Sequence, residues 1–390
     1  MNHISEPNDV GWRKLLDAMV DKLKTDGVLR SHRVELAMRT VPRHEFLVDD
    51  CDVEEAYTGD VVRILADAQG GTLSTASHVA AVARMLEVLD AQPGEHVLEI
   101  GLGTGYNAAL LAHMVGATGH VTAIDNEATL VRSAERNLNR LQLTNVTSIV
   151  RDGWLGDESN APYDALIATV GLSDLSPHWI AQLRDGGRLV VPMWLSTIAQ
   201  PGVIFTKHGD RLEGRVFSNP SFIMLKGRGE DDLGGWVLVD DTFWTVRDAS
   251  RTTWETLKQL LSKPPIATTE LPELDRMWSY WLGLEDPHVV MAYLQDEART
   301  IQLGLFDPDL PGMAVVEGKA RTVRGYGDRA TMDRLIDLVI QRRPRSPETL
   351  KDRRIVDLLV DAVPHGQATR PTGGWLFERQ HYDFVVTAPS

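Results

Sequence analysis

The sequence predicts an α/β fold, in which a doubly wound parallel sheet follows N-terminal helices and precedes a separate α+β domain. Short apolar segments alternate with helical ones from about residue 77 to residue 192. This alternation is typical of a parallel sheet covered by helices on both faces. It stops after about residue 225. The length of 390 residues also exceeds one average domain, which favours two.

The N-terminal region is expected to be helical and then irregular. Apolar residues recur at helical spacing within residues 11–40, and Gly27 interrupts them. Residues 50–75 are rich in Asp and Gly, which indicates an irregular functional loop. A helix over Ala80–Leu89 leads into the alternating region.

The strands and helices of the central region follow from local apolar patterns. The predicted strands are His96–Ile100, Val121–Ile124, Val146–Val150, Ala165–Thr169 and Arg188–Pro192. The predicted helices between them are Asn107–Met114, Glu127–Leu141 and Pro177–Arg184. The crossovers between parallel strands should be right-handed.

The C-terminal part has a different organisation. Residues 227–235 are rich in Gly and Asp and resemble a linker or a long surface loop. The predicted helices beyond it are Thr252–Leu261, Ala330–Gln341 and Thr349–Ala362, and the predicted strands are Met313–Val316 and Phe384–Thr387. We therefore divide the chain into residues 1–76, 77–225 and 226–390.

The composition excludes several classes of protein. The formal net charge of −15 opposes binding to phosphate backbones, so we expect no nucleic-acid partner. Cys51 is the only cysteine, which excludes a disulfide within the chain and a cysteine-rich zinc site. We expect no metal, and a reducing, cytoplasmic location. No signal-like segment begins the chain, and no run of about 18 apolar residues predicts a membrane span.

A glycine-rich turn at residues 98–106 is the most informative motif. Gly101, Gly103 and Gly105 lie between a predicted strand and a predicted helix, where glycine permits a tight turn and a close approach of the backbone to a ligand. Asp125 ends the next strand, twenty residues after Gly105, where a carboxylate can accept both ribose hydroxyls. The glycines alone would also fit an ordinary tight turn.

The details of this motif favour S-adenosylmethionine over a dinucleotide. The dinucleotide pattern is G-x-G-x-x-G, and Tyr106 stands where its last glycine should be. Glu99 would oppose the phosphates of a dinucleotide, but it suits a zwitterionic ligand that carries a sulfonium. Asp152 follows the strand that ends at Val150 and can accept a hydrogen bond from an adenine amino group.

Several motifs occur in the order found in one enzyme family. The sequence resembles the protein-L-isoaspartate (D-aspartate) O-methyltransferase family over about residues 30–195. The motifs that carry the resemblance are Val41–Phe46, Ala56-Tyr57, Gly71–Ser74, Val97–Ala112, Asp152-Gly153, Ala161–Asp164 and Gly186–Pro192. The resemblance implies the Rossmann-like sheet of class I methyltransferases, S-adenosyl-L-methionine as cofactor, and a carboxylate of a peptide or protein as methyl acceptor.

The resemblance also assigns residues to the two substrates. Ser74 matches the pocket serine that binds the acceptor carboxylate, although on its spacing alone it would equally fit a helix N-cap. The expected acceptor-binding residues are Ala56, Tyr57, Thr72, Leu73 and His78, of which His78 is also explained as a capping or packing residue. The expected cofactor-binding residues are Glu99, Gly101, Leu102, Gly103, Asn107, Asp125, Asn126, Asp152 and Gly153.

Three departures from the family pattern concern the acceptor. Ala76 stands where the family usually has proline, and Gly59 stands where it usually has an acid, with Asp60 one position later. Residues 225–390 are extra relative to an ordinary repair enzyme. The chain thereby resembles longer relatives that methylate one aspartate of ribosomally made, modified peptides, such as lanthipeptides, graspetides and lasso peptides. In that branch the ester goes on to aspartimide and isoaspartate.

The chemistry expected from this family needs few side chains. A carboxylate with a reference pKa of about 4 is already ionised near pH 7, so no general base is required. Our first hypothesis is a methyltransferase acting on a modified precursor peptide, with residues 226–390 recognising that peptide. The alternatives are a general isoaspartyl repair enzyme and a non-catalytic peptide-binding protein. Arg342, Arg343 and Arg345 form either a solvated face or a docking site for an acidic peptide. The oligomeric state stays open.

Overall fold

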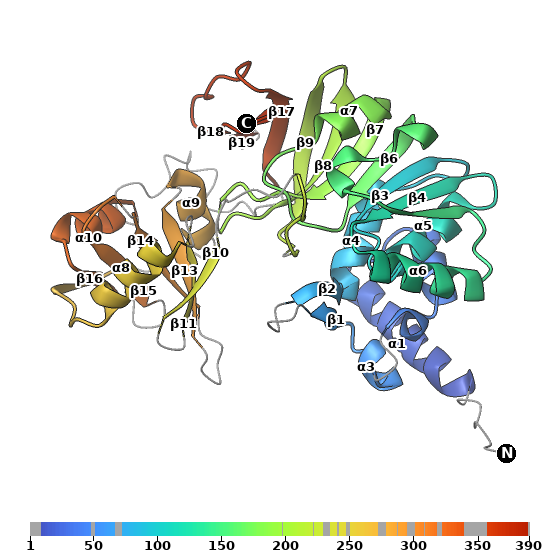
Figure 1. The fold of residues 1–390 in the computed structure, drawn as a ribbon, viewed down its shortest axis with the longest axis horizontal. Coiled ribbons are helices and arrows are strands. Elements are labelled where there is room, and N and C mark those ends of the chain that lie inside the picture. The colour runs from blue at the N-terminus through green and yellow to red at the C-terminus, as the bar shows by residue number, and fades with distance from the viewer. Residues whose placement is uncertain are drawn as a thin grey trace. The chain divides into compact units, whose positions relative to one another are not determined.

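The computed structural model describes residues 9–47, 51–66, 72–196, 198–220, 222–228, 235–239, 242–246, 250–271, 278–286, 288–294, 301–307, 309–317, 322–338 and 357–388. The chain forms two compact units. The first unit contains Met1–Pro192, Gly202–Glu230 and Asp361–Pro364, and the second contains Met193–Pro201, Asp231–Val360 and His365–Ser390. Figure 1 shows the elements of both units.

The first unit is built around a sheet whose centre is parallel. Its strands are β3 (His96–Ile100), β4 (His120–Asp125), β5 (Val146–Val150), β6 (Tyr163–Ala168), β7 (Leu183–Pro192), β8 (Gly202–His208), β9 (Arg211–Ser218) and β17 (Leu359–Pro364). The order is β17-β9-β8-β7-β6-β3-β4-β5. The five strands β7-β6-β3-β4-β5 pair in parallel, and β8 and β9 pair antiparallel. The predicted doubly wound α/β sheet is therefore confirmed.

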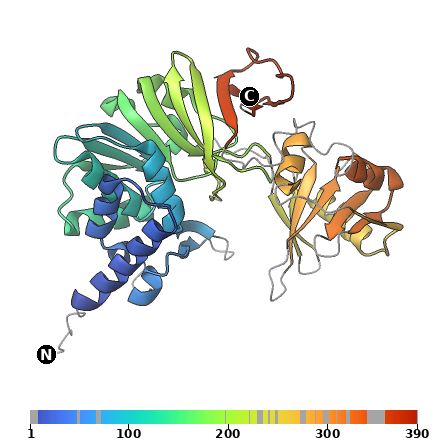
Figure 2. The same cartoon turned by 180° about the vertical axis from the view of Figure 1, so that it is seen from behind.

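Helices cover this sheet, as the two opposite views show (Figures 1 and 2). They are α4 (Val79–Leu89), α5 (Tyr106–Val115), α6 (Ala128–Arg140) and α7 (Pro177–Gln182), with the short 3-10 turns η2 (Gly153–Leu155) and η3 (Glu158–Asn160). Almost every side chain of α5 is buried, which explains why its sequence is a continuous apolar run rather than an amphipathic one. The predicted helices agree with these elements, except that Leu183 and Arg184, predicted as the end of a helix, begin strand β7.

N-terminal helices pack on the same core. They are α1 (Asp9–Thr25) and α2 (His32–Thr40), followed by the 3-10 turn η1 (Arg43–Phe46). Val20, Met38 and Phe46 are fully buried in the core that α4 and α5 share. Gly27 adopts a positive φ of 69° between the two helices, and this is the break that the sequence predicts.

The region expected to be irregular contains regular elements. Residues 50–75 include α3 (Val53–Ala56) and the antiparallel hairpin of β1 (Val62–Ala66) and β2 (Thr72–Ala76). The expectation of an irregular loop was wrong for these two strands. Of the Asp and Gly residues that suggested it, three lie between the two strands in the sequence and four precede them: Asp67, Gly70 and Gly71, and Asp50, Asp52, Gly59 and Asp60. The strands themselves are short and β-branched or apolar, and their pairing partner is not visible in a local pattern.

The second unit is an α+β unit, as predicted. Its sheet has the order β10-β11-β13-β14-β15-β16-β12 and is antiparallel throughout. The strands are β10 (Gly235–Val239), β11 (Thr242–Val246), β12 (Ala267–Glu270), β13 (Val289–Leu294), β14 (Ile301–Phe306), β15 (Met313–Glu317) and β16 (Thr322–Tyr326). The helices are α8 (Arg251–Leu261), α9 (Trp278–Glu285) and α10 (Arg329–Ile336), and β18 (Trp375–Phe377) pairs with β19 (Tyr382–Thr387).

One predicted helix is wrong at its end. Residues 359–362 belong to strand β17, although the sequence predicts a helix over Thr349–Ala362. Alternate burial explains the strand, because Val360 and Ala362 are buried while Leu359 is exposed. The start of that helix, and the basic residues Arg342, Arg343 and Arg345, lie outside the described residues. Within the described part of the chain, no helix is long and apolar enough to cross a membrane.

Candidate active site

The glycine turn after β3 combines tight packing with one open position. Gly101, Gly103 and Gly105 all have positive φ angles, of 94°, 53° and 89°, which favour glycine. A Cβ on Gly101 would lie 2.7 Å from Oγ1 of Thr169. A Cβ on Gly103 would meet nothing nearer than Oγ of Ser74, at 3.9 Å. A Cβ on the middle glycine would therefore fit without a clash, at van der Waals distance from the Ser74 hydroxyl, so the two residues lie close together.

A buried carboxylate lies at the start of this turn. Glu99 is fully buried, and its Oε1 accepts a hydrogen bond of 2.8 Å from Nδ2 of Asn107 on α5. Burial raises the pKa of Glu99 to about 8. Oε2 of Glu99 and Oδ1 of Asn107 have no hydrogen-bond partner among the described residues. Two buried acceptors without donors suit an ammonium group, which has donors only.

Hydrogen bonds to Asp125 join the glycine turn to the end of β4. Its Oδ2 accepts a hydrogen bond of 2.9 Å from the backbone N–H of Gly103, and Oδ1 accepts one of 3.0 Å from Glu127. The backbone N–H of Leu102 donates to the carbonyl of Ile124 at 3.0 Å. Each carboxylate oxygen keeps a second acceptor site, so both remain available to vicinal hydroxyls such as those of a ribose.

A segment that the sequence assigned to a linker completes this side of the site. Asp152 precedes the buried Gly153, and its Oδ2 accepts a hydrogen bond of 3.0 Å from the backbone N–H of Arg228. A Cβ on Gly227 would lie 2.9 Å from the Asp152 carboxyl group. The exposed Asn126 donates from Nδ2 to the carbonyl of Lys226 at 3.4 Å. Residues 226–228 therefore lie against Asp152 and Asn126, two predicted cofactor residues. In the sequence, Gly227 is the only one of the three that suggests such a close approach.

Ser74 is on β2 with its side chain buried, whereas Thr72 and Leu73 are exposed. The structure excludes the capping explanation of this serine. The N-cap of α4 is His78, whose Nδ1 accepts a hydrogen bond of 3.1 Å from the backbone N–H of Ala80. Ser74 does not cap the helix, which leaves its hydroxyl to face the glycine turn. His78 has the capping role instead.

Two further residues that the sequence predicts to bind the acceptor lie at the end of α3. Ala56 is buried, and the buried Tyr57 pairs its hydroxyl with Nδ1 of His44 at 2.7 Å. Burial raises the pKa of Tyr57 well above its ordinary value. The carbonyl of Gly59 accepts a hydrogen bond of 2.9 Å from the N–H of Val79. Residues 56–60, the predicted acceptor loop, are thereby attached to the start of α4.

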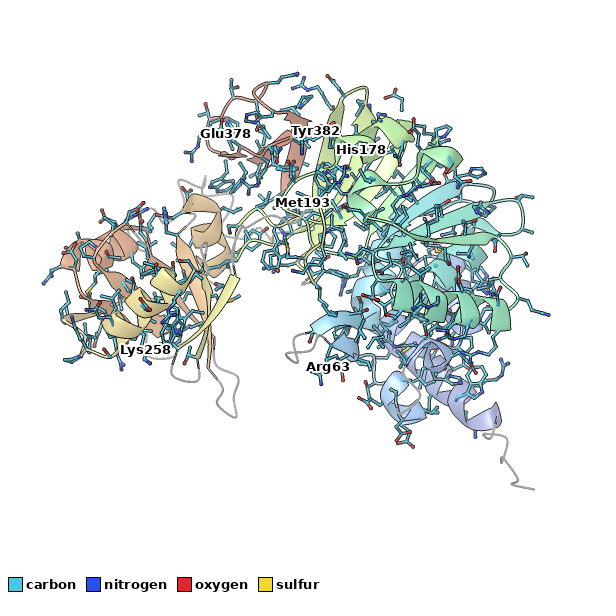
Figure 3. The ribbon with its side chains drawn as sticks, viewed as in Figure 1. Arg63, His178, Met193, Lys258, Glu378 and Tyr382 are labelled. Atoms are coloured by element: carbon cyan, nitrogen blue, oxygen red, sulfur yellow. The ribbon has the colours of Figure 1, made fainter. Side chains whose placement is uncertain are left out.

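The hairpin that carries Ser74 has one face toward the unit and one face toward solvent. Arg63 of β1 lies opposite Thr75, and it is labelled at the hairpin in Figure 3. Thr75 is only partly buried, and as the neighbour of Ser74 on a strand it points to the other face. Across the residues that the structure describes, no group of three His, Cys, Asp or Glu side chains is close enough to hold a metal ion.

Comparison with known proteins identifies relatives of this arrangement. The family model named protein-L-isoaspartate(D-aspartate) O-methyltransferase matches residues 14–230. The chain is 34% identical over 223 residues to a protein-L-isoaspartate O-methyltransferase of Methanococcus aeolicus, covering 57% of this chain and 97% of that relative. It is 35% identical over 206 residues to the enzyme of the same name from Thermotoga maritima, covering 53% of this chain and 64% of the relative.

A solved structure extends the similarity beyond the first unit. It is a protein-L-isoaspartate O-methyltransferase that superposes with a TM-score of 0.53 at 25% identity. The match covers 89% of this chain and 96% of that chain. The similarity therefore includes most of the C-terminal part as well as the sheet that carries the glycine turn.

Proposed function

Because this chain belongs to the protein-L-isoaspartate(D-aspartate) O-methyltransferase family, we propose that it methylates the carboxylate of isoaspartyl residues in proteins or peptides, with S-adenosyl-L-methionine as the methyl donor. Membership makes it a protein carboxyl O-methyltransferase. The observation that carries the proposal is Ser74, whose buried hydroxyl faces Gly103 of the glycine turn.

The residues around the glycine turn fit this cofactor. Glu99 and Asn107 offer two unpartnered buried acceptors to the ammonium of its methionine part. Asp125 would accept hydrogen bonds from the ribose hydroxyls, and Asp152 would accept one from the adenine amino group. The cofactor supplies a methyl group on a sulfonium, whose leaving group is a neutral thioether.

The acceptor needs to be held rather than activated. A carboxylate has a reference pKa of about 4 and is ionised at neutral pH, so the protein has to align its oxygen with the methyl group and exclude water. The Ser74 hydroxyl donates one hydrogen bond to this oxygen and leaves its charge in place. An Arg or Lys partner would stabilise the ground-state anion more strongly, which would raise the barrier to transfer.

The test is methyl transfer from labelled S-adenosylmethionine to a short isoaspartyl peptide, with the same peptide containing ordinary aspartate as control. We expect label only in the isoaspartyl peptide. Ser74→Ala should lower kcat/KM on the order of a hundredfold and leave the affinity for S-adenosylhomocysteine unchanged. Thr75→Ala, the matched hydroxyl on the other face of β2, should change neither. Equal turnover of Ser74→Ala and wild type would remove Ser74 from the site.

A modified precursor peptide is the second candidate acceptor. Two acceptor positions favour it, because Ala76 and Gly59 depart from the family pattern. The second unit, proposed to recognise the peptide, is weaker support, since a solved isoaspartate methyltransferase matches 89% of this chain. Label that enters an encoded aspartate of a cyclised precursor, and is then released as methanol when the backbone nitrogen attacks the ester to form an aspartimide, would support this candidate. Label in the isoaspartyl test peptide alone would exclude it.

A further inference from the structure

A buried guanidinium lies between the segments that form the acceptor region. Arg43, in the turn η1, is only 1% exposed. Its Nη1 donates a hydrogen bond of 3.0 Å to the carbonyl of Ser77, and its Nη2 donates one of 3.0 Å to the carbonyl of Asp60. One rigid, planar group therefore joins the end of the acceptor loop to the residue three positions after Ser74.

The same group contacts the cofactor side of the site. The Cζ atom of Arg43 lies 5.5 Å from the ring centre of Tyr106, which directly follows Gly105. This distance is within the range of a cation–π interaction. Nε of Arg43 and the hydroxyl of Tyr106 are both buried without a hydrogen-bond partner among the described residues. The guanidinium thus touches three segments that come together only in the fold.

Stability alone does not explain this arginine. Burial lowers the pKa of Arg43, which reflects the cost of removing a cation from water. Its hydrogen bonds to Ser77 and Asp60 go to neutral carbonyls, and no carboxylate of the described residues forms an ion pair with it. Apolar side chains of similar volume often replace buried charges at equal or better stability. The guanidinium is therefore better explained by the geometry that it imposes on its carbonyl partners.

We propose that Arg43 is a positioning residue, which sets the distance between the acceptor loop and the Ser74 strand and holds both against the glycine turn. The inference rests on the proposed function for its meaning in catalysis. Without Arg43, the acceptor loop and α4 would still be joined by the hydrogen bond from the N–H of Val79 to the carbonyl of Gly59. A misplacement of about 1 Å is enough to lower transfer on the order of a hundredfold.

Two substitutions and one control test the proposal in the full-length protein. Arg43→Lys keeps the charge, but its single nitrogen cannot span two carbonyls in the fork geometry of arginine. Arg43→Gln removes the charge as well. The control is Arg33→Lys, because Arg33 also joins two segments, donating to the carbonyl of Ala91 at 3.0 Å and to Oε1 of Gln92 at 2.9 Å, away from the glycine turn.

Three measurements separate positioning from a general loss of structure. Both Arg43 variants should lose kcat/KM for the isoaspartyl peptide by about tenfold to a hundredfold. They should bind S-adenosylhomocysteine within about twofold of wild type in calorimetry, and Arg33→Lys should change neither value. Hydrogen exchange should accelerate at the amide of Val79 and in residues 56–60 for Arg43→Lys, and not for Arg33→Lys.

The outcomes keep this inference distinct from the proposed function. If wild type methylates the peptide and Arg43→Lys has the same kcat/KM, the positioning role is wrong. An equal loss of cofactor affinity in Arg43→Lys would also overturn it, because the effect would then be global. If wild type methylates nothing, the proposed function fails, and hydrogen exchange still decides whether Arg43 holds the loop. Should Arg43→Gln not fold, the result for Arg43→Lys stands by itself.

Discussion

Replacing Glu99 by Gln should remove a pH dependence from cofactor binding. Burial raises the pKa of the Glu99 carboxyl from 4.5 to about 8, so at pH 7 the side chain is mostly protonated in the free protein. An ammonium group beside Oε2 would favour the ionised carboxylate and lower this pKa. Binding of S-adenosylhomocysteine at pH 7 should then release close to one proton from wild type and none from Glu99→Gln.

The size of the effect follows from the ionised fraction. With a pKa of about 8, this fraction rises from roughly 1% at pH 6 to about half at pH 8. If the ammonium holds the pKa of the bound state below 6, the affinity of wild type should rise up to about 50-fold over this interval. The amino group of the ligand, with a reference pKa of about 8, titrates equally against both proteins and cancels in the comparison.

The same shift changes stability in a defined direction. The unfolded chain loses the Glu99 proton near pH 4.5, whereas the folded chain keeps it until about pH 8. The contribution of Glu99 to the free energy of unfolding is therefore fully present below pH 4.5. It is lost as the pH rises from 4.5 to about 8. Each pH unit costs about 1.4 kcal/mol, so the loss is on the order of 5 kcal/mol. Glu99→Gln should lack this decline.

Calorimetry in two buffers of different ionisation enthalpy counts the released protons, and urea unfolding at pH 5 and pH 8 measures the stability term. Wild type and Glu99→Gln have to differ in both measurements for the reasoning to stand. Parallel affinity profiles between pH 6 and pH 8, or no proton release by wild type at pH 7, would refute the pairing of Glu99 with the ligand ammonium.

Two glycines give further predictions. Gly105→Ala should destabilise the protein by about 1–3 kcal/mol in urea unfolding, because its φ is 89° and its Cβ would lie 3.1 Å from Cβ of Ala134. Gly27→Ala, at a φ of 69° with open space around it, should cost less, and equal losses would contradict the packing argument. Gly227→Ala should weaken S-adenosylhomocysteine binding about tenfold and also destabilise the protein by about 1–3 kcal/mol, because its φ is 112° and its Cβ would lie 2.9 Å from the Asp152 carboxyl group. Unchanged affinity would exclude residues 226–228 from the site.

The sequence predicted the part of the site that depends on local order. Gly101, Gly103 and Asp125 lie at the ends of adjacent parallel strands, and such ends meet at one edge of a sheet. The resemblance to one family added Ser74, which pattern alone could not separate from a helix cap. The structure favours its role at the site by placing the cap at His78.

Other features depend on partners far away in the sequence. Residues 227–228 begin the segment 227–235 whose composition resembles a linker, and only the fold brings them against Asp152. Arg43 is one basic residue in a turn until its carbonyl partners at Asp60 and Ser77 are known. Strand β17 contains enough helix-forming residues to suggest a helix, and only its pairing with β9 makes it a strand. Local propensity predicts secondary structure poorly where pairing with a distant strand determines it.

The return of the chain to its first sheet limits how the protein can be shortened. Strand β17 comes from residues 359–364 and pairs with β9, which ends at Ser218. Truncation after Glu230 would strip β9 of its neighbour and leave a bare row of N–H and C=O groups, a common template for aggregation. Any shortened version of the first unit therefore has to keep Asp361–Pro364 paired with β9.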